Sequence, residues 1–475
     1  MASSELVSET TLCSVCKNIH DAIHGFIPLT LLACKVIDNP IFQRLRKLKQ
    51  LGTCNYIYHN AVHTRFEHSI GTYHLAGRIL TRIASITDPK EIDTYLSEIP
   101  ELKAYYIRTY DNAVHILDNY VQELIKIAAL CHDIGHGPFS HVFDDVFIIE
   151  MKKQTSPYAT HEARSGALLE KLIKSDPVLS KIVTSDEIQF MKNLINPTKQ
   201  NTGFIYQIVS NNLNGLDVDK YDYLSRDSYS INIKSGFEFQ RLIDHVLIID
   251  NNICYPEQAT TDIYNLYLTR HSLHRRVYSH KGVISAQYMI VELMINLDPI
   301  LKISEAIDDL DKFVILNDDY ILESTNILSS VHLLPQFSKN ISNAKKILAL
   351  LNSHKLYPCI GWHISKNSID IDVDKLFNYV IDKTDILVFQ NKIGFVSGNK
   401  SNPLDNIFVF KTKDVFGMSP NIKSVKCNKD NITLVMPTIH QEYITMVFYK
   451  QREDTNIIDK MKQTFKEFTC ALSPI

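Results

Sequence analysis

The stretch "LCHDIGHGPFSH" (residues 130–141) places three histidines and an aspartate within twelve residues. Leu124, Ala128 and His132 recur at four-residue spacing, so His132 continues the apolar face of a predicted helix. The imidazole of His132 and the carboxylate that follows it can together bind one metal ion at the helix end. A lone His-Asp pair is more often a buried histidine capped by its neighbour. Whether this stretch forms a metal site or a capped buried histidine therefore depends on the rest of the chain.

The composition describes an ordinary soluble protein of more than one domain. Its 475 residues predict about two to four domains. Apolar residues make up 45% of the chain and charged residues 22%, which is normal for globular proteins. The 50 basic residues nearly balance the 53 acidic ones, and the net charge is −3. This balance gives no electrostatic reason to expect nucleic acid or an anionic membrane as the main partner.

Targeting signals are also lacking. No apolar run approaches about 18 residues, and no basic segment followed by an apolar one opens the chain, so we expect neither a membrane span nor a secretory signal. Nine cysteines in such a chain indicate reduced thiols and a cytoplasmic location. The segment "RLRKLK" (44–49) is closest to a nuclear import signal, but its alternation with leucine is more typical of a solvated helix face. A nuclear location stays open.

The hydrophobic pattern changes along the chain. We expect a flexible segment over residues 1–20 and a mainly helical domain over 21–340, where apolar residues recur at three- and four-residue spacing. β-Branched and aromatic runs predict strands over 385–398, 406–414 and 431–450, and the pattern over 457–472 predicts a terminal helix. The predicted fold is therefore mainly α, a helical catalytic core with a smaller α+β C-terminal lobe over 341–475.

Three further clusters of polar residues follow helical spacing. Arg65 and His68 lie three residues apart at the start of one predicted helix. Asp219, Tyr223 and Asp227 recur every four residues on another, with Lys220 beside them, and Arg270, His274 and Tyr278 repeat that spacing on a third. Each cluster alone fits a solvated face about as well as a site. Together with the opening stretch they favour a shared pocket.

The residue types in this pocket suit hydrolysis of a phosphate ester. Two imidazoles and two carboxylates (His68, His132, Asp133, Asp219) form a mixed nitrogen and oxygen site for a divalent ion such as Mn²⁺, Fe²⁺, Mg²⁺ or Zn²⁺. Arg65 and Lys220, beside these candidate ligands, can hold phosphate oxygens. His141, with Asp144 three residues on, has the form of an oriented imidazole for proton transfer.

These residues also carry a family resemblance. The segments "RFEHSIG", "AALCHDIGHGPFSHVFD", "GLDVDKYDYLSRD" and "TRHSLHRRVY" resemble the HD-domain deoxynucleotide triphosphohydrolases, in particular the branch whose vertebrate members add a sterile alpha motif. The likeness extends through "DAIHGFIPL", "DNPIFQRLRKLKQLG" and "AIDDL", over roughly residues 21–310. An isolated HD pair is weak evidence, whereas this ordered set is specific. The resemblance implies conversion of a dNTP and water to a deoxynucleoside and inorganic triphosphate.

The resemblance also implies roles for individual residues. The four candidate ligands match the family's metal ligands, and a further Mg²⁺ can accompany the triphosphate. The other matched residues contact the triphosphate (Arg65, His136, Lys220, Arg270), surround the α-phosphate for proton transfer (His141, Asp144, His161, Glu162), read the sugar 3′-hydroxyl (Gln50, Tyr223, Asp227) or leave no room for a 2′-hydroxyl (Leu51, Tyr278), with His274 as a further substrate-pocket candidate. Steric exclusion suits the last task, because a pocket otherwise rejects an added hydroxyl poorly.

Several features depart from the family pattern. Only about 20 residues precede the core, so we expect no sterile alpha motif, and Ser279 replaces a family glutamine in the catalytic pocket. The resemblance implies a dimer or tetramer with regulatory nucleotides bound between its subunits. GTP or dGTP is the candidate regulator. The residues that match this regulatory site are Lys17, Asp38, Gln43, Arg46 and Arg241. Basic residues and an asparagine expected at a second regulatory site are replaced by Pro256, Gln258, Asp262, His354 and Pro358. We therefore expect hydrolysis that does not require the second regulatory nucleotide.

Other interpretations remain open at this point. Cys13, Cys16, His20 and His24 have a spacing loosely like that of a zinc site, although a loose chain end explains them better. The pocket also fits an HD phosphohydrolase that acts on a monophosphate or a cyclic nucleotide. A third possibility is an inactive relative that binds nucleotides or single-stranded nucleic acid. The candidate sugar contacts favour the triphosphohydrolase, and the complete ligand set argues against an inactive relative.

Overall fold

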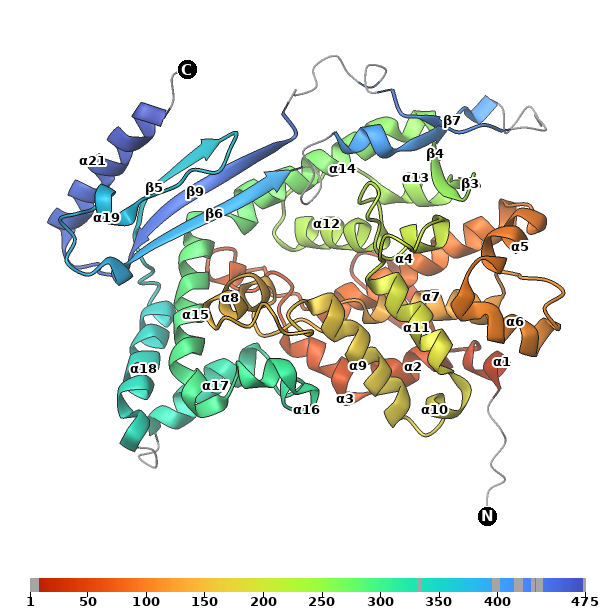
Figure 1. Ribbon diagram of the computed structural model, residues 1–475, viewed down its shortest axis with the longest axis horizontal. Helices are drawn as coiled ribbons and strands as arrows, with labels where there is room; N and C mark the ends of the chain where they lie inside the picture. Colours follow the sequence, from red (N-terminus) through yellow and green to blue (C-terminus); the bar gives the residue numbers. More distant parts are fainter. Residues whose placement is uncertain are drawn as a thin grey trace.

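The computed structural model describes residues 8–330, 335–394, 402–413, 422–428, 432 and 439–472. A large helical body carries two small sheets along its upper side in Figure 1. The predicted fold class, mainly α with a smaller α+β C-terminal region, is confirmed. Parts of the predicted strands over 385–398, 406–414 and 431–450 lie outside the described residues.

Three helices form the centre of the body and position the site. α4 (Arg65–Ile86) packs against α7 (Asn119–Cys131) and α12 (Val218–Ser230). Each begins at a side chain that accepts backbone N–H groups of its first turn, because Thr64, Asp118 and Asp217 are the respective N-caps. These caps fix where each helix starts, and His68 and Asp219 lie in the first turns of α4 and α12.

Further helices surround this centre. α9 (His161–Ser175) and α11 (Ser185–Ile195) pack against each other, and α11 also covers α7. Two π-helical turns, η4 (Phe143–Phe147) and η7 (His274–Tyr278), interrupt the regular helices. The other α-helices of the body include α2 (Leu31–Ile37), α3 (Pro40–Gln43), α5 (Pro89–Ser97), α6 (Lys103–Tyr110), α8 (Ile148–Glu150), α10 (Leu179–Ile182), α13 (Phe239–Asp244), α14 (Thr260–Leu273), α16 (Leu310–Phe313) and α17 (Asp318–Ser330).

The N-terminal residues are structured from about residue 8. α1 (Glu9–Leu12) begins at the N-cap Ser8, and β1 (Val15–Asp21) pairs with β2 (Gly25–Thr30) in an antiparallel hairpin. The prediction of a flexible segment over residues 1–20 is therefore wrong for residues 8–20. The polar sequence was misleading because most of β1 is exposed, while β2 buries Ile27 and Leu29 in the core.

α15 (Lys281–Leu301) and α18 (Ser338–Asn352) pack side by side (Figure 1). α15 is long and apolar enough to cross a membrane, but 56% of its most apolar window is buried within the protein. Both helices contribute to the main hydrophobic core, for example through Leu293 and Ala344. α18 thus crosses the predicted boundary at 340/341 while packing with the helical body, and the division into domains stays a prediction.

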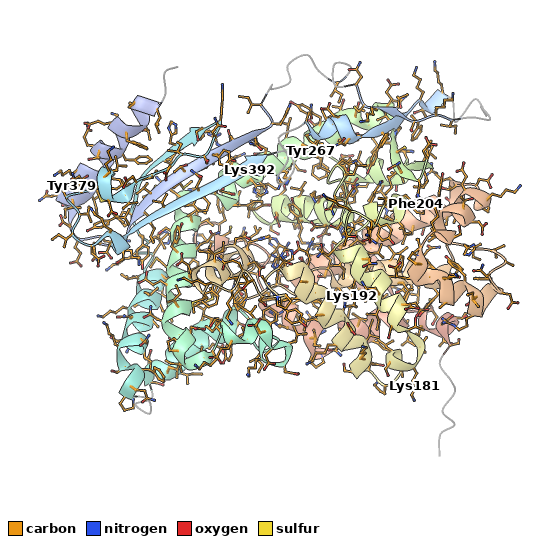
Figure 2. The ribbon with its side chains drawn as sticks, viewed as in Figure 1. Lys181, Lys192, Phe204, Tyr267, Tyr379 and Lys392 are labelled. Carbon is orange, nitrogen blue, oxygen red and sulfur yellow. The ribbon has the colours of Figure 1, made fainter. Side chains whose placement is uncertain are left out.

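The C-terminal region has a small core of its own. β5 (Cys359–Ser365), β9 (Gln441–Tyr449) and β6 (Ile386–Gly394) form an antiparallel sheet in that order, with α19 (Val373–Leu376) and α21 (Thr455–Leu472) beside it. The Tyr379 hydroxyl lies 2.8 Å from Thr464 Oγ1 of α21 at this end of the molecule (Figure 2). The predicted terminal helix is confirmed.

The second sheet joins distant parts of the chain. Its strand order is β3 (Leu247–Ile249), β4 (Asn252–Pro256), β7 (Phe408–Phe410) and β8 (Val425–Lys426). β4 pairs with β7 in parallel, so C-terminal residues complete a sheet that begins in the helical body. Ile407 and Val409 are accordingly buried in the main core.

Candidate metal and phosphohydrolase site

Four side chains from three helix ends converge on one point. His68 lies in the first turn of α4, His132 caps the end of α7 beside Asp133, and Asp219 lies in the first turn of α12. The Nε2 atom of His68 is 3.1 Å from Asp219 Oδ1 and 3.5 Å from Asp133 Oδ2. The Nε2 atom of His132 is 3.4 Å from Asp133 Oδ1 and 3.5 Å from Asp219 Oδ1. All four predicted ligands therefore meet.

The electrostatics of this cluster suit a bound cation. The Nε2 atoms of His68 and His132 are buried, and neither makes a well-formed hydrogen bond within the described part of the chain. Burial opposes protonation of His68, but the facing Asp219 and Asp222 outweigh it and raise the pKa of His68 to about 10. Buried ring nitrogens without a hydrogen-bond partner that face carboxylates are the arrangement expected where nitrogen and oxygen ligands bind one divalent ion.

A carboxylate that the sequence analysis missed orients the His68 ring. The Oδ2 atom of Asp222 is 2.8 Å from His68 Nδ1, and its Oδ1 atom is 2.6 Å from His24 Nε2. Arg226 also donates to Asp222 and to Asp21. Burial disfavours the Asp222 carboxylate, but Arg226 and the imidazoles hold its pKa well below the ordinary value. The available signal was the position of Asp222, one helical turn after Asp219.

A second cluster lies beside the candidate metal site and corrects one prediction. The Oδ2 atom of Asp144, in η4, is 2.8 Å from His136 Nδ1 and 3.7 Å from His161 Nδ1, and its Oδ1 atom accepts from Arg164. The rings of His136 and His161 stack with centroids 3.9 Å apart. The predicted pair of His141 and Asp144 is therefore wrong, because Asp144 orients His136 instead.

His141 faces a different carboxylate. Its Nδ1 atom is 3.4 Å from Asp145 Oδ2, and the His141 side chain is 62% exposed. Its ring centroid lies 5.1 Å from that of His136. Glu162 lies in the first turn of α9, and its Oε1 atom is 3.4 Å from His161 Nε2. His141 and Asp145 lie four residues apart, which is an ordinary helical spacing, so spacing alone allows either Asp144 or Asp145 as the partner of His141. His141, His161 and Glu162 nevertheless border one region.

The glycines of the opening stretch have a structural role. A Cβ atom on Gly135 would lie 2.2 Å from the His161 carbonyl oxygen, and one on Gly137 would lie 2.2 Å from the Phe143 ring. These residues permit close packing against α9 and η4. The left-handed turn falls instead on Phe139 and Ser140, with φ of 59° and 58°.

The candidate phosphate cations are each held by protein groups. Arg65 donates to Asp133 and to Ser140 Oγ, and Lys220 Nζ lies 3.0 Å from Asp217 Oδ2. Arg270 donates from Nη1 to the Gly394 carbonyl at the end of β6. The charge of His274 is disfavoured first by burial and then by Arg270 and His141, which lowers its pKa well below the usual value.

The candidate sugar contacts form a linked group. Asp227 accepts from the Tyr278 hydroxyl at 2.5 Å, and its other oxygen lies 2.7 Å from His63 Nε2. Tyr223 lies one turn before Asp227 on α12. Burial raises the pKa of Tyr278, and Asp227 and then Tyr223 raise it further. Gln50 is buried with Leu51 half-buried next to it. His63, two residues before Arg65, was not among the residues predicted from the sequence.

The candidate regulatory residues lie on the surface in two places. Arg46 packs over the Phe66 ring and donates to Gln43, which itself donates to the Ile37 carbonyl beside the exposed Asp38. Lys17 is exposed on β1. Arg241 is on α13 instead, 3.2 Å from Asp262 of α14.

The four residues with zinc-like spacing do not come together. Cys13 Sγ faces the Asn119 carbonyl, Cys16 Sγ lies 3.2 Å from Cys34 Sγ, and His24 contacts Asp222. The ring of His20 packs edge-on against Phe26. A zinc site formed by these four residues is therefore contradicted by the structure, because each of the four side chains faces a different partner.

Comparison with known proteins agrees with this geometry. Residues 65–227, from the start of α4 to Asp227, match the HD domain family. The fold and the His-His-Asp-Asp cluster thus define an HD-domain phosphohydrolase.

Relatives with curated descriptions identify the family more closely. A deoxynucleoside triphosphate triphosphohydrolase SAMHD1 homolog of Dictyostelium discoideum is 33% identical, covering 92% of this chain and 78% of that protein. Human deoxynucleoside triphosphate triphosphohydrolase SAMHD1 is 30% identical, covering 92% of this chain and 70% of that protein. A putative HD domain-containing protein of Acanthamoeba polyphaga mimivirus is 41% identical over 82% of this chain and 83% of its own length. The chain belongs to the SAMHD1 family of HD-domain enzymes, which confirms the resemblance.

Proposed function

We propose that this enzyme hydrolyses deoxynucleoside triphosphates to the deoxynucleoside and inorganic triphosphate, and thereby lowers dNTP pools. The observation that carries the proposal is the convergence of the four candidate ligands at the start of α12. The same helix carries a ligand, a cation and two sugar contacts in order (Asp219, Lys220, Tyr223, Asp227). From first to last they span about 12 Å at the helical rise. This length suits one nucleotide laid along the helix.

A divalent ion would be held by His68, His132, Asp133 and Asp219. The ligand types are compatible with Mn²⁺, Fe²⁺, Mg²⁺ and Zn²⁺. When bound, such an ion lowers the pKa of water and neutralises phosphoryl charge. Asp222 keeps the His68 ring directed at the site, and Arg65 holds Asp133 in place.

The remaining residues bind and orient the substrate or move a proton. Lys220 and Arg270 supply positive charge for the triphosphate, and Asp227 and Tyr278 would meet the 3′-hydroxyl. His136, oriented by Asp144, faces Asp133 with its Nε2 atom at 3.4 Å. The exposed His141 is the candidate that gives a proton to the departing 5′-oxygen, with Asp145 as its carboxylate.

We propose in addition that hydrolysis does not need a second regulatory nucleotide. Arg241 is already paired with Asp262, and Gln258 accepts from Thr412. The loss of basic residues from the second regulatory site weakens its attraction for an anionic nucleotide. A homo-oligomer and a GTP or dGTP regulator near Lys17 and Asp38 remain part of this proposal. Assays of dCTP hydrolysis with and without GTP or dGTP test whether the second regulatory nucleotide is needed. Strict dependence on an added deoxynucleotide activator contradicts hydrolysis without that second nucleotide.

The decisive experiment incubates the purified protein with dGTP or GTP in the presence of Mn²⁺ or Mg²⁺ and separates the products. Deoxyguanosine plus triphosphate, from dGTP only, supports the proposal. Monophosphate plus pyrophosphate points to another HD phosphohydrolase, and binding without turnover points to an inactive relative. His132→Ala and Asp133→Ala should abolish turnover, and retained activity contradicts the assigned ligands.

A further inference from the structure

A buried carboxylate outside the matched HD domain joins two turns of the site. Asp318 is the first residue of α17 and is 0% exposed. Its Oδ1 atom accepts the Phe139 N–H at 2.6 Å, and its Oδ2 atom accepts the Lys49 N–H at 3.1 Å. One of these turns precedes Gln50 and Leu51, and the other precedes His141. A single side chain thus holds the backbone on both the sugar side and the proton-transfer side of the pocket.

The Phe139 turn needs such support. Phe139 and Ser140 both have left-handed backbone conformations, which non-glycine residues seldom adopt and which persist only where the surroundings impose them. The bond from the Phe139 N–H to Asp318 lies at the centre of this turn. Burial raises the pKa of Asp318 to about 6, against the smaller opposing effects of Lys49 and the two backbone N–H groups. The side chain is still mainly a carboxylate at neutral pH, with two oxygens available as acceptors.

The two turns are also in direct contact. Ser140 Oγ donates to the Lys49 carbonyl at 2.7 Å and accepts from Arg65 Nε at 2.9 Å. A Cβ atom on Gly52 would lie 2.6 Å from the Phe139 carbonyl oxygen. A shift of either turn therefore displaces the other, and both reach Arg65.

The neighbouring Leu316 completes the connection. Buried Arg44 donates to the carbonyls of Leu316, Ile134 and His136 at 2.7, 3.1 and 2.5 Å. The segment 316–318 is thus bound to both ends of the loop that runs from the ligand Asp133 to His141.

We propose that Asp318 is a positioning residue that sets the spacing between the turn carrying Gln50 and Leu51 and the turn carrying His136 and His141. The inference rests on the proposed function, because it predicts an effect on the choice between deoxyribose and ribose. If the turn at residues 49–52 moves away from the pocket, Leu51 no longer excludes a 2′-hydroxyl, and the sugar and the phosphate are no longer aligned together.

The test compares Asp318→Asn with Asp319→Asn, its neighbour on the same helix. An asparagine of nearly equal size keeps one acceptor oxygen but places an NH₂ group against the other backbone N–H. Because misplacement by about 1 Å can cost about 10²-fold in rate, we expect a drop of about 10- to 100-fold in kcat on dGTP. We also expect a smaller ratio of kcat/KM for dGTP over GTP. Asp319→Asn should leave both values unchanged.

Hydrogen exchange separates this inference from the proposed function. In Asp318→Asn the amides of Lys49 and Phe139 should exchange faster than in the wild type, whatever reaction the enzyme performs. Faster exchange in a protein that does not hydrolyse dGTP contradicts the proposed function and leaves the backbone role intact. Unchanged exchange at both amides overturns the inference. A loss of dGTP turnover with an unchanged dGTP to GTP ratio also overturns it, because a purely structural defect affects both substrates alike.

Discussion

The Nδ1 atom of His68 lies 2.8 Å from Asp222 Oδ2, and this contact leaves the His68 Nε2 atom directed at Asp133 and Asp219. The ring can be a ligand only if Nε2 has no proton, which requires the proton on Nδ1. Asp222 accepts a hydrogen bond from the protonated Nδ1 atom and so selects the His68 tautomer whose Nε2 atom is free of a proton.

Replacing Asp222 with asparagine should therefore weaken metal binding. The substituted side chain keeps its size but loses the charge that four neighbouring donors share. We expect the affinity for Mn²⁺ to fall by about 10- to 100-fold. Titration of the metal-free protein with Mn²⁺ measures this directly. Asp311→Asn changes a carboxylate that is 83% exposed and should bind Mn²⁺ like the wild type. An Asp222→Asn protein with unaltered affinity contradicts the assigned role.

Gly71 of α4 makes room for the same carboxylate. A Cβ atom at Gly71 would lie 1.9 Å from Asp222 Oδ1 and 2.7 Å from Arg226 Nη2, within a fully buried group. Gly71→Ala should therefore displace Asp222, lower the stability by about 1–3 kcal/mol and weaken Mn²⁺ binding. Thermal unfolding and the Mn²⁺ titration provide the two measurements.

Gly77 provides the matched control on the same helix. Its added Cβ would meet only the flexible end of Lys126, at 3.4 Å. Gly77→Ala should be neutral, or stabilising by up to about 1 kcal/mol, because alanine favours the helix interior. Equal effects of the two substitutions would show that Asp222 is not confined in the way described.

Helical periodicity accounts for what could be predicted from the sequence. The spacing of apolar residues predicted α4 and α7, and the spacing of polar residues predicted α12. The polar residues at the ends of these helices supplied the four ligands that converge in the structure. A ligand at a helix end depends only on local capping and on which face is buried. Both are encoded over a few neighbouring residues.

The contacts that could not be predicted depend on long-range packing or on irregular turns. Asp144 meets His136 across the left-handed turn at Phe139 and Ser140, a contact that no helical period indicates. Asp318 reaches Phe139 across 179 residues of sequence. The parallel pairing of β4 with β7 likewise joins strands that lie far apart in the chain, with Cys254 opposite Phe408. Such contacts follow from the packing of the whole core.

His63 should matter through Asp227. Its Nε2 atom lies 2.7 Å from Asp227 Oδ1, opposite the Tyr278 hydroxyl. His63→Ala frees the carboxylate to rotate, and we expect kcat/KM for dGTP to fall by about tenfold, in proportion to one lost charge-assisted hydrogen bond. Dideoxy-GTP, which has no 3′-hydroxyl, should be affected much less. Steady-state kinetics on both substrates measure the difference. His59→Ala, at an exposed position, is the control, and equal losses on both substrates contradict a role at the 3′-hydroxyl.

His74 should make the protein less stable in mild acid. It lies on α4 with its ring centroid 5.3 Å from that of His24, and burial, then His24 and Arg78, lower the pKa of His74 from 6.5 to about 4. Between these two values the unfolded chain binds a proton at this position and the folded protein does not. The stability contributed by the neutral ring is therefore complete above about pH 6.5 and is lost as the pH falls toward about 4.

His74→Gln removes this titration and should flatten the acid side of the stability curve. Relative to the wild type, the variant should gain about 2 kcal/mol between about pH 7 and about pH 4.5, a value reduced for the partial exposure of the ring. Urea unfolding at both pH values measures this gain. His59→Gln replaces an exposed histidine and should follow the wild-type curve. Parallel curves for His74→Gln and the wild type would mean that His74 is protonated equally in the folded and unfolded states.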